Sequence, residues 1–244
     1  MKFGIIGAGS IGSIISRKLV KNGHDVKIAD ARGMEHLEGK DLAGKPVRAE
    51  DAITNIEVLI LSLPLRALSS VRNIIGQVGE EVIVVDTSNY YPGRDDKIEE
   101  IEDGMVESIW VSNQLGRPII KAFNNLLAYT LENEGTPEGA SGRIAMAVAG
   151  DNVKHKQIIM DVVNQIGFDT VDGGSLSDSW RQQPGTPAYC TELTKDELTI
   201  ALKEANKEKV PLLRDKVMEM LSVANPKLLS NKDIVNMNRE IYNS

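Results

Sequence analysis

Gly7-Ala8-Gly9-Ser10-Ile11-Gly12 is the stretch of this chain that decides its fold. The apolar run Lys2–Gly7 leads into it and predicts a buried strand, while the apolar positions of Ser10–Asn22 recur at helical spacing. Glycines between a strand and a helix allow a tight turn, a close backbone approach to a pyrophosphate and close helix–strand packing. The N–H groups at the start of the helix favour an anion. We therefore expect a nicotinamide dinucleotide to bind with its pyrophosphate over this loop.

Strands and helices continue to alternate beyond this unit. Further strands are expected at His24–Asp30, Lys45–Ala49, Glu57–Leu63, Glu81–Asp86 and Pro118–Phe123. Helices are expected between them, at Glu50–Asn55 and Leu65–Val78. This order predicts an α/β protein with a Rossmann-type, doubly wound, mainly parallel sheet and right-handed crossovers.

The regular alternation of predicted strands and helices changes after Asn125, so we expect two domains. Residues 1–125 would form the dinucleotide-binding Rossmann domain, and residues 126–244 a smaller C-terminal α/β domain that ends in helices. Its elements are expected as strands at Arg143–Ala149 and Phe168–Asp172, a helix at Asn152–Ile166, and a largely helical stretch at Glu192–Val223 interrupted by Pro211. The tail past Pro226 is expected to be helical and exposed.

Composition narrows the function classes. The chain has 244 residues, 41% of them hydrophobic, and a formal net charge of −7, which argues against a nucleic-acid partner and an anionic membrane. No apolar stretch approaches the length of a membrane span. The single cysteine, Cys190, is expected to be a buried structural thiol, and the scarcity of cysteine favours a cytoplasmic location. No residue cluster has metal-ligand spacing.

Two residues bear on the choice of coenzyme. Asp30 ends the second predicted strand, about 20 residues beyond the glycine loop, where a carboxylate would bind the ribose 2′-hydroxyl of NAD. Arg32 follows two positions later and would suit the 2′-phosphate of NADP. At about 4 Å and an effective dielectric constant near 20, each charge contributes about 4 kcal/mol with opposite sign. The sequence therefore leaves NAD and NADP open.

The nicotinamide half of the coenzyme should lie beyond the carboxyl ends of the strands. Leu63-Pro64 follows one predicted strand, and Asp86-Thr87-Ser88-Asn89 follows another. Ser88 and Asn89 are therefore candidate coenzyme-binding residues. Asn89 has an equally good structural reading as a turn former before Tyr90-Tyr91-Pro92-Gly93.

These segments together resemble the NADP oxidoreductase family that includes the deazaflavin (coenzyme F-420)-dependent NADP reductases and the cytosolic domain of the six-transmembrane metalloreductases. The resemblance rests on four segments: the glycine loop, Asp86–Asn89, Lys121-Ala122-Phe123-Asn124 and Asp172–Ser179. It implies hydride transfer between a nicotinamide and a flavin or deazaflavin ring, a reaction that depends on stacking geometry rather than on an acid or base. We accordingly expect no catalytic side chain.

The resemblance also suggests where each ring binds. It places Ala122 and Asn124 beside the coenzyme, and Ser177 and Ser179 beside the second, small-molecule redox acceptor. The adjoining Trp180 and Arg181 offer a ring face and a cation to that acceptor. Equally, the Trp180–Pro187 loop has a purely structural reading, as a proline-stiffened segment whose Trp is buried against the sheet or a second subunit.

Other functions compete with this one. A non-catalytic NAD(P)-sensing module of a cation transporter would share the glycine loop, the acidic residue and a small C-terminal domain. A hydroxyacid dehydrogenase would need a long helical domain with a catalytic lysine, for which too few residues remain after Asn125. The amphipathic run Leu198–Leu221 predicts a homodimer contact.

Overall fold

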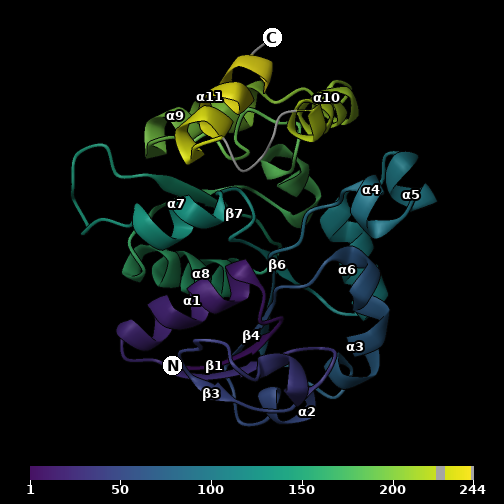
Figure 1. The fold of residues 1–244 in the computed structure, drawn as a ribbon, viewed down its shortest axis with the longest axis vertical. Coiled ribbons are helices and arrows are strands. Elements are labelled where there is room, and N and C mark those ends of the chain that lie inside the picture. The colour runs from purple at the N-terminus through teal and green to yellow at the C-terminus, as the bar shows by residue number, and fades with distance from the viewer. Residues whose placement is uncertain (224–228, 243–244) are drawn as a thin grey trace.

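The computed structural model describes residues 1–223 and 229–242 and is built around a six-stranded parallel sheet (Figure 1). The strand order is β3-β2-β1-β4-β5-β6, which is the Rossmann order and confirms the predicted fold class. The strands are β1 (Lys2–Ile6), β2 (Asp25–Ala29), β3 (Lys45–Pro46), β4 (Val58–Leu61), β5 (Ile83–Asp86) and β6 (Ile120–Lys121). The connecting helices are α1 (Ser10–Lys21), α2 (Ala49–Ala52), α3 (Leu68–Ile75), α4 (Pro92–Asp95), α5 (Glu99–Glu102) and α6 (Glu107–Leu115), with short 3₁₀ turns η1 (Met34–Leu37) and η2 (Leu65–Ala67).

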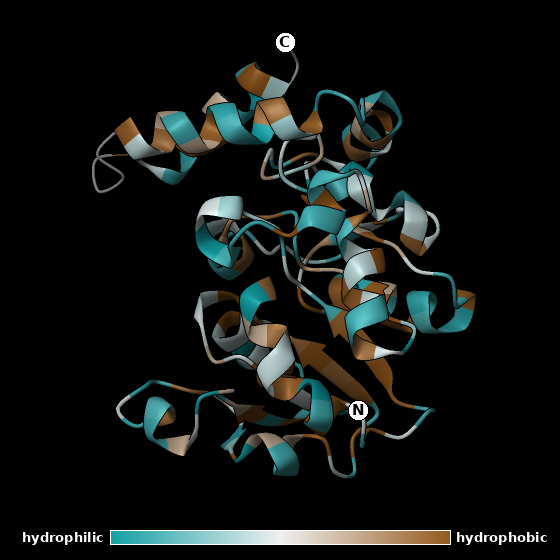
Figure 2. Ribbon diagram, turned by 90° about the vertical axis from the view of Figure 1, so that its right-hand side faces the viewer, coloured by the Kyte–Doolittle hydropathy of each residue, from teal (hydrophilic) through white to brown (hydrophobic). Residues whose placement is uncertain are grey.

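The strands are apolar on both faces because helices cover both faces of the sheet. Phe3 and Ile5 of β1 point into the core under α1, whereas Ile6 points into the opposite core, which α3 and α6 cover. Every residue of β4 and β5 is buried. Figure 2 shows the contrast between these hydrophobic strands and the mixed hydropathy of the helices around them.

A second, two-stranded parallel sheet packs against the first. It consists of β7 (Ala145–Val148) and β8 (Asp169–Asp172), connected by α8 (Val153–Gln165), and it follows α7 (Ala128–Asn133). Lys121 of the large sheet and Ala149 exchange two backbone hydrogen bonds, at 2.8 and 3.0 Å. One hydrophobic cluster contains Phe3 of the large sheet and Phe168 beside the small one. The residues on either side of the boundary predicted at Asn125 therefore share a core, and the division into two domains stays a prediction.

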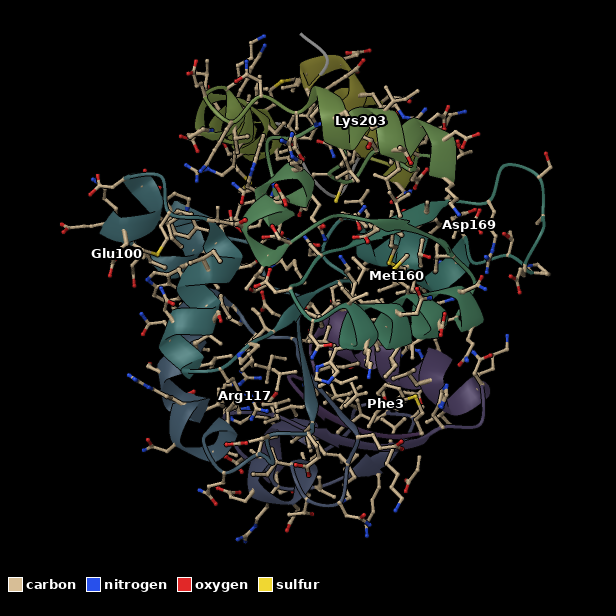
Figure 3. All side chains as sticks on the ribbon, turned by 180° about the vertical axis from the view of Figure 1, so that it is seen from behind. Phe3, Glu100, Arg117, Met160, Asp169 and Lys203 are labelled. Atoms are coloured by element: carbon tan, nitrogen blue, oxygen red, sulfur yellow. The ribbon has the colours of Figure 1, made fainter. Side chains whose placement is uncertain are left out.

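The C-terminal helices lie at the end of the molecule opposite β1–β3, as the positions of Lys203 and Phe3 show (Figure 3). They are α9 (Lys195–Glu204), α10 (Val210–Val223) and α11 (Asn231–Tyr242), preceded by the 3₁₀ helix η3 (Leu176–Gln182). No helix in the described ranges is both long and apolar enough to cross a membrane.

Two expectations about these helices are corrected. The break in the helical stretch was expected at Pro211, but it lies before this residue. The helix α10 begins at Val210 and includes Pro211, because proline is tolerated in the first turn of a helix. The tail was expected to be exposed, but α11 buries one face, including Ile241 and Tyr242. Pro226 itself lies outside the described residues. Much of the apolar side of Leu198–Leu221 packs within the chain, and the homodimer stays a prediction.

Candidate functional site

Two glycines of the loop, Gly7 and Gly12, lie against other backbone atoms, whereas the third, Gly9, faces open space. A Cβ on Gly7, whose φ is +117°, would lie 2.1 Å from the Ser62 carbonyl oxygen, and a Cβ on Gly12 would lie 1.9 Å from the Gly7 carbonyl oxygen. A Cβ on Gly9 would meet nothing within 4 Å. Gly9 is also the N-cap of α1 and lacks a side-chain cap, so the first N–H groups of that helix are available to a ligand. The loop thus has the cradle that a pyrophosphate needs.

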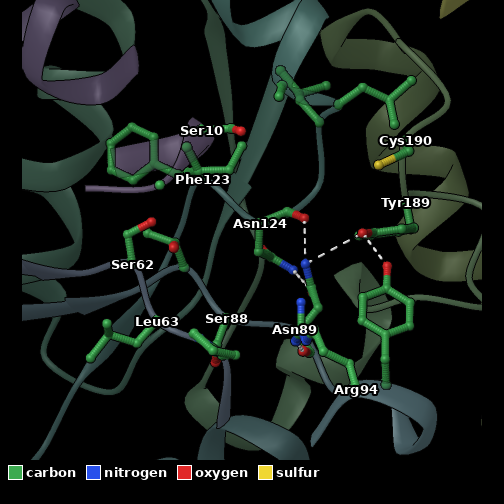
Figure 4. Close-up of a pocket in the computed structure, with 18 residues that line it drawn as sticks. Ser10, Ser62, Leu63, Ser88, Asn89, Arg94, Phe123, Asn124, Tyr189 and Cys190 are labelled. Atoms are coloured by element: carbon green, nitrogen blue, oxygen red, sulfur yellow. Dashed lines mark hydrogen bonds between the residues drawn. The ribbon is translucent and has the colours of Figure 1, made fainter. Parts of the chain in front are cut away.

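A cavity of about 320 Å³ runs from this loop along the carboxyl ends of the strands (Figure 4). Eight predicted site residues line it: Gly9, Ser10, Ile11, Leu63, Pro64, Ser88, Asn89 and Asn124. The structure adds ten that were not predicted: Ser62, Thr87, Tyr91, Arg94, Phe123, Leu126, Leu127, Ala128, Tyr189 and Cys190. Its volume lies at the small end of the range for ligand sites.

A side-chain amide network holds the middle of the cavity. Asn89 Nδ2 donates to the Asn124 carbonyl oxygen, and Asn124 Nδ2 donates to Asn89 Oδ1, each at 3.0 Å. Gln182 Nε2 donates to Asn124 Oδ1 at 2.8 Å, and the Gln182 carbonyl oxygen accepts from Asn124 Nδ2 at 2.9 Å. The two asparagines are therefore fixed in orientation at the place expected for the nicotinamide. Gln182, which sequence reasoning did not single out, is the residue of the Trp180–Pro187 loop that makes this contact.

A buried ion pair supports the wall of the cavity at Ser88. Lys121 Nζ lies 2.7 Å from Asp86 Oδ2, and both side chains are almost fully buried. The same ammonium donates to the Ser88 carbonyl oxygen, while the Ser88 N–H and hydroxyl donate to the Asp86 carboxylate at 3.1 and 3.0 Å. The pair therefore fixes the backbone that follows β5.

The far end of the cavity is formed by two tyrosines. The hydroxyl oxygens of Tyr91 and Tyr189 are 2.6 Å apart, and Asn89 Nδ2 lies 3.4 Å from the Tyr189 hydroxyl oxygen. The Arg94 guanidinium stacks 5.1 Å from the Tyr91 ring centroid and pairs with the buried Asp95 carboxylate at 2.7 Å. No local sequence signal marks Tyr189, since it reaches the cavity only through the fold.

Other predicted residues lie away from this cavity. The Ala122 side chain is fully buried in the core and does not line the cavity, so its contact with the coenzyme stays a prediction. Ser177, Ser179, Trp180 and Arg181 all belong to η3, which packs against α6. The Arg181 guanidinium stacks 4.4 Å from the Trp180 ring centroid and lines a separate cavity beside α9. These four residues do not line the main cavity, and their role in acceptor binding stays a prediction.

Asp30 and Arg32, which the sequence offered as alternative ligands of the coenzyme ribose, form an ion pair with each other. The Arg32 guanidinium donates to both Asp30 carboxylate oxygens at 2.9 Å, and its pairing with Asp30 holds the pKa of that carboxyl down at about 2. Lys40 Nζ lies 3.6 Å from the same carboxylate and donates to the Ala8 carbonyl oxygen at 3.0 Å. Two cations therefore surround the Asp30 carboxylate beside the glycine loop.

Glu107, at the start of α6, is a buried carboxyl behind the cavity wall. Its Oε2 accepts from the Tyr90 N–H at 3.0 Å. Burial raises its pKa to about 7, although Lys121 nearby lowers it. The unfolded carboxyl titrates near 4.3. The folded protein therefore holds this proton more tightly, so the contribution to stability is full below about pH 4.3 and is lost as pH rises through about 7.

Glu107→Gln, which stays neutral, should remove this pH dependence. At pH 8 the variant should exceed the wild-type free energy of unfolding by up to about 3 kcal/mol, and the gain should shrink towards pH 5. Urea unfolding at the two pH values measures this. Glu100→Gln, an exposed carboxyl on α5, is the control. An equal change with pH in the wild type and Glu107→Gln would contradict the assignment.

Taken together, the Rossmann sheet, the open glycine loop and the cavity at the carboxyl ends of its strands define an NAD(P)-binding oxidoreductase fold. Residues 2–90 match the family described as NADP oxidoreductase, coenzyme F420-dependent. The resemblance seen in the sequence is thus confirmed over the N-terminal region, which contains the glycine loop, Asp30 and Asn89.

Individual proteins extend this comparison. Protein YjhV of Escherichia coli (strain K12) is 46% identical over 76 residues, which are 31% of this chain and 48% of that protein, so the match spans about half of its length. The structure of the hypothetical protein SMa0349 from Sinorhizobium meliloti has a TM-score of 0.67 and 29% identity, covering 80% of this chain and 96% of that one. A "putative f420 dependent nadp-reductase" from Arthrobacter sp. FB24 shares the fold, with a TM-score of 0.58 at 14% identity over 91% of this chain and 94% of that one.

Proposed function

We propose that this protein transfers a hydride between NADPH and a flavin- or deazaflavin-like acceptor bound in the same cavity. The observation that carries the proposal is the continuity of the cavity, which joins the open Gly9 to the polar residues Asn89, Asn124 and Tyr189. The family that matches residues 2–90 is described by both NADP and coenzyme F420, which supports this pairing.

The residues of the chain have distinct tasks in this reaction. The backbone of Gly9–Ile11 would hold the pyrophosphate, and Leu63-Pro64 with the fixed Asn89–Asn124 pair would orient the nicotinamide. When bound, the coenzyme supplies the hydride. The apolar side chains of Leu126 and Leu127, which line the cavity, would exclude water from the reacting rings.

NADPH is proposed over NADH because Arg32 and Lys40 outnumber Asp30 at the end of β2. Each charge within about 4 Å of the 2′-phosphate contributes about 1–4 kcal/mol, so the excess cation favours the phosphate. Arg32 is 65% exposed and is able to turn toward a ligand while Lys40 remains beside Asp30.

Arg32→Gln and Lys40→Gln should each lower the preference for NADPH over NADH by about tenfold, which corresponds to about 1.4 kcal/mol. The dissociation constants of both coenzymes, measured by fluorescence titration, give the ratio. Lys45→Gln, on the exposed strand β3, is the matched control and should leave the ratio unchanged. A ratio that stays at its wild-type value in both variants would overturn the choice of NADPH.

Turnover tests the proposed function directly. Purified protein is mixed with NADPH or NADH and with riboflavin, FMN, FAD or a deazaflavin, and oxidation of the nicotinamide is followed by absorbance. We expect NADPH oxidation with at least one ring acceptor. Tight coenzyme binding without turnover on any acceptor would instead favour the NAD(P)-sensing module.

A further inference from the structure

The paired hydroxyls of Tyr91 and Tyr189 have no task in coenzyme binding as described above. Tyr189 lies across the cavity from Ser10 of the glycine loop, beside Asn89 (Figure 4), and the Tyr91 hydroxyl is hydrogen-bonded to it. We infer that this tyrosine pair binds the carbonyl oxygen of a neutral ring acceptor by a hydrogen bond. The inference rests on the proposed function in one respect only, that the acceptor shares the cavity with the coenzyme.

The two tyrosine hydroxyls together have one hydrogen that they can donate to a ligand. Each hydroxyl carries one hydrogen and accepts through its oxygen. The single bond between the two oxygens, at 2.6 Å, uses one of the two hydrogens. Asn89 Nδ2, at 3.4 Å from Tyr189, donates and so takes up an acceptor position rather than a hydrogen. Burial raises the pKa of the neighbouring Cys190 thiol to about 12, although a hydrogen bond with Tyr189 acts in the opposite direction. The partner of the second hydrogen is therefore a neutral sulfur, a weak acceptor that a ring carbonyl oxygen would displace.

The segment that carries Tyr189 is held rigidly. Cys190 has a φ of +54°, a left-handed conformation that is costly for a side chain with a Cβ and concentrates at functional sites. Its N–H donates to the Asn125 carbonyl oxygen at 2.9 Å, and its carbonyl oxygen accepts from Asn238 Nδ2 of α11 at 3.1 Å. Arg239 Nε donates to the next carbonyl oxygen, that of Thr191, at 2.7 Å. The C-terminal helix therefore fixes the tyrosine in place, as a binding group requires.

The charged side chains that line the cavity indicate whether the acceptor is neutral or anionic. Among the described residues that line the cavity, Arg94 is the one that carries a full charge, and the buried Asp95 carboxylate pairs with it at 2.7 Å. A substrate carboxylate would find no unpaired cation there, whereas a ring carbonyl requires only a hydroxyl donor. The site therefore suits a neutral, carbonyl-bearing ring rather than an organic acid.

Riboflavin, which is neutral, is the probe. Its fluorescence is titrated with wild-type protein in the presence of NADP⁺, and the same protein is assayed for NADPH oxidation with riboflavin. Tyr189→Phe should raise the dissociation constant and the KM of riboflavin about tenfold, the loss expected for one hydrogen bond, and should leave the affinity for NADPH within about twofold. Tyr91→Phe should act in the same direction. Tyr129→Phe, a tyrosine 56% exposed on α7, should change neither value.

The outcomes separate the two proposals. Riboflavin binding that is weakened by Tyr189→Phe, without turnover on riboflavin, FMN, FAD or a deazaflavin, would overturn the proposed function and support the tyrosine site. Turnover with unchanged riboflavin affinity in both tyrosine variants would overturn the tyrosine site alone. Absence of riboflavin binding to the wild type, with NADPH bound normally, would overturn the tyrosine site, while turnover with FMN, FAD or a deazaflavin would still support the proposed function. Thermal unfolding of each variant verifies that the fold is retained.

Discussion

Gly9→Ala should abolish most coenzyme affinity while leaving the fold intact. A Cβ at this position meets no protein atom within 4 Å, so the folded state gains no clash. The same Cβ would occupy the space above the N-terminus of α1, where the pyrophosphate is expected to lie. We expect the dissociation constants of NADPH and NADH to rise at least tenfold, which corresponds to about 1.4 kcal/mol or more. Fluorescence titration and thermal unfolding, carried out on the same sample, separate binding from stability.

Gly76→Ala is the matched control for that prediction. Gly76 follows α3 with a φ of −61°, and a Cβ there would make only ordinary contacts, the nearest at 3.5 Å. Its coenzyme affinity should equal that of the wild type. Unchanged affinity in Gly9→Ala would show that the loop does not bind the pyrophosphate, since no other effect of this substitution is expected.

Lys121→Met should destabilise the protein more than any surface change. The substitution leaves the Asp86 carboxylate buried without its cation, and breaking one side of a buried ion pair costs about 3–5 kcal/mol. For a chain of this size that loss corresponds to a fall in Tm of about 6–20 °C. The Ser88 carbonyl oxygen also loses its donor, so coenzyme affinity should fall together with stability. Calorimetry and urea unfolding measure the change.

A surface ion pair is the control for the buried one. Arg17 and Glu132 connect α1 with α7, and each side chain is about one-third exposed. Arg17→Met should therefore cost less than about 1 kcal/mol. Similar losses in Lys121→Met and Arg17→Met would show that burial does not set the strength of the Asp86–Lys121 pair.

Much of the Rossmann half follows from the sequence because its signals are local. The glycine loop, the apolar strands β4 and β5 and the helix α1 are each encoded within a dozen consecutive residues, and their periodicity indicates their type. The ends of the strands depend on the tertiary structure. Of the strand expected at Pro118–Phe123, only Ile120–Lys121 forms one. Phe123 adopts a φ of +60° and turns the chain into the cavity.

What the sequence by itself determined is the fold class, the glycine loop between β1 and α1, and the ends of the strands that Leu63, Asn89 and Asn124 follow. Only the tertiary structure decided what completes the site. Tyr91 and Tyr189 are 98 positions apart, and Asn124 and Gln182 are 58 positions apart, yet each pair is joined by a hydrogen bond. No local pattern encodes such contacts, because they depend on how the small sheet packs against the large one and on how α11 holds the segment that carries Tyr189.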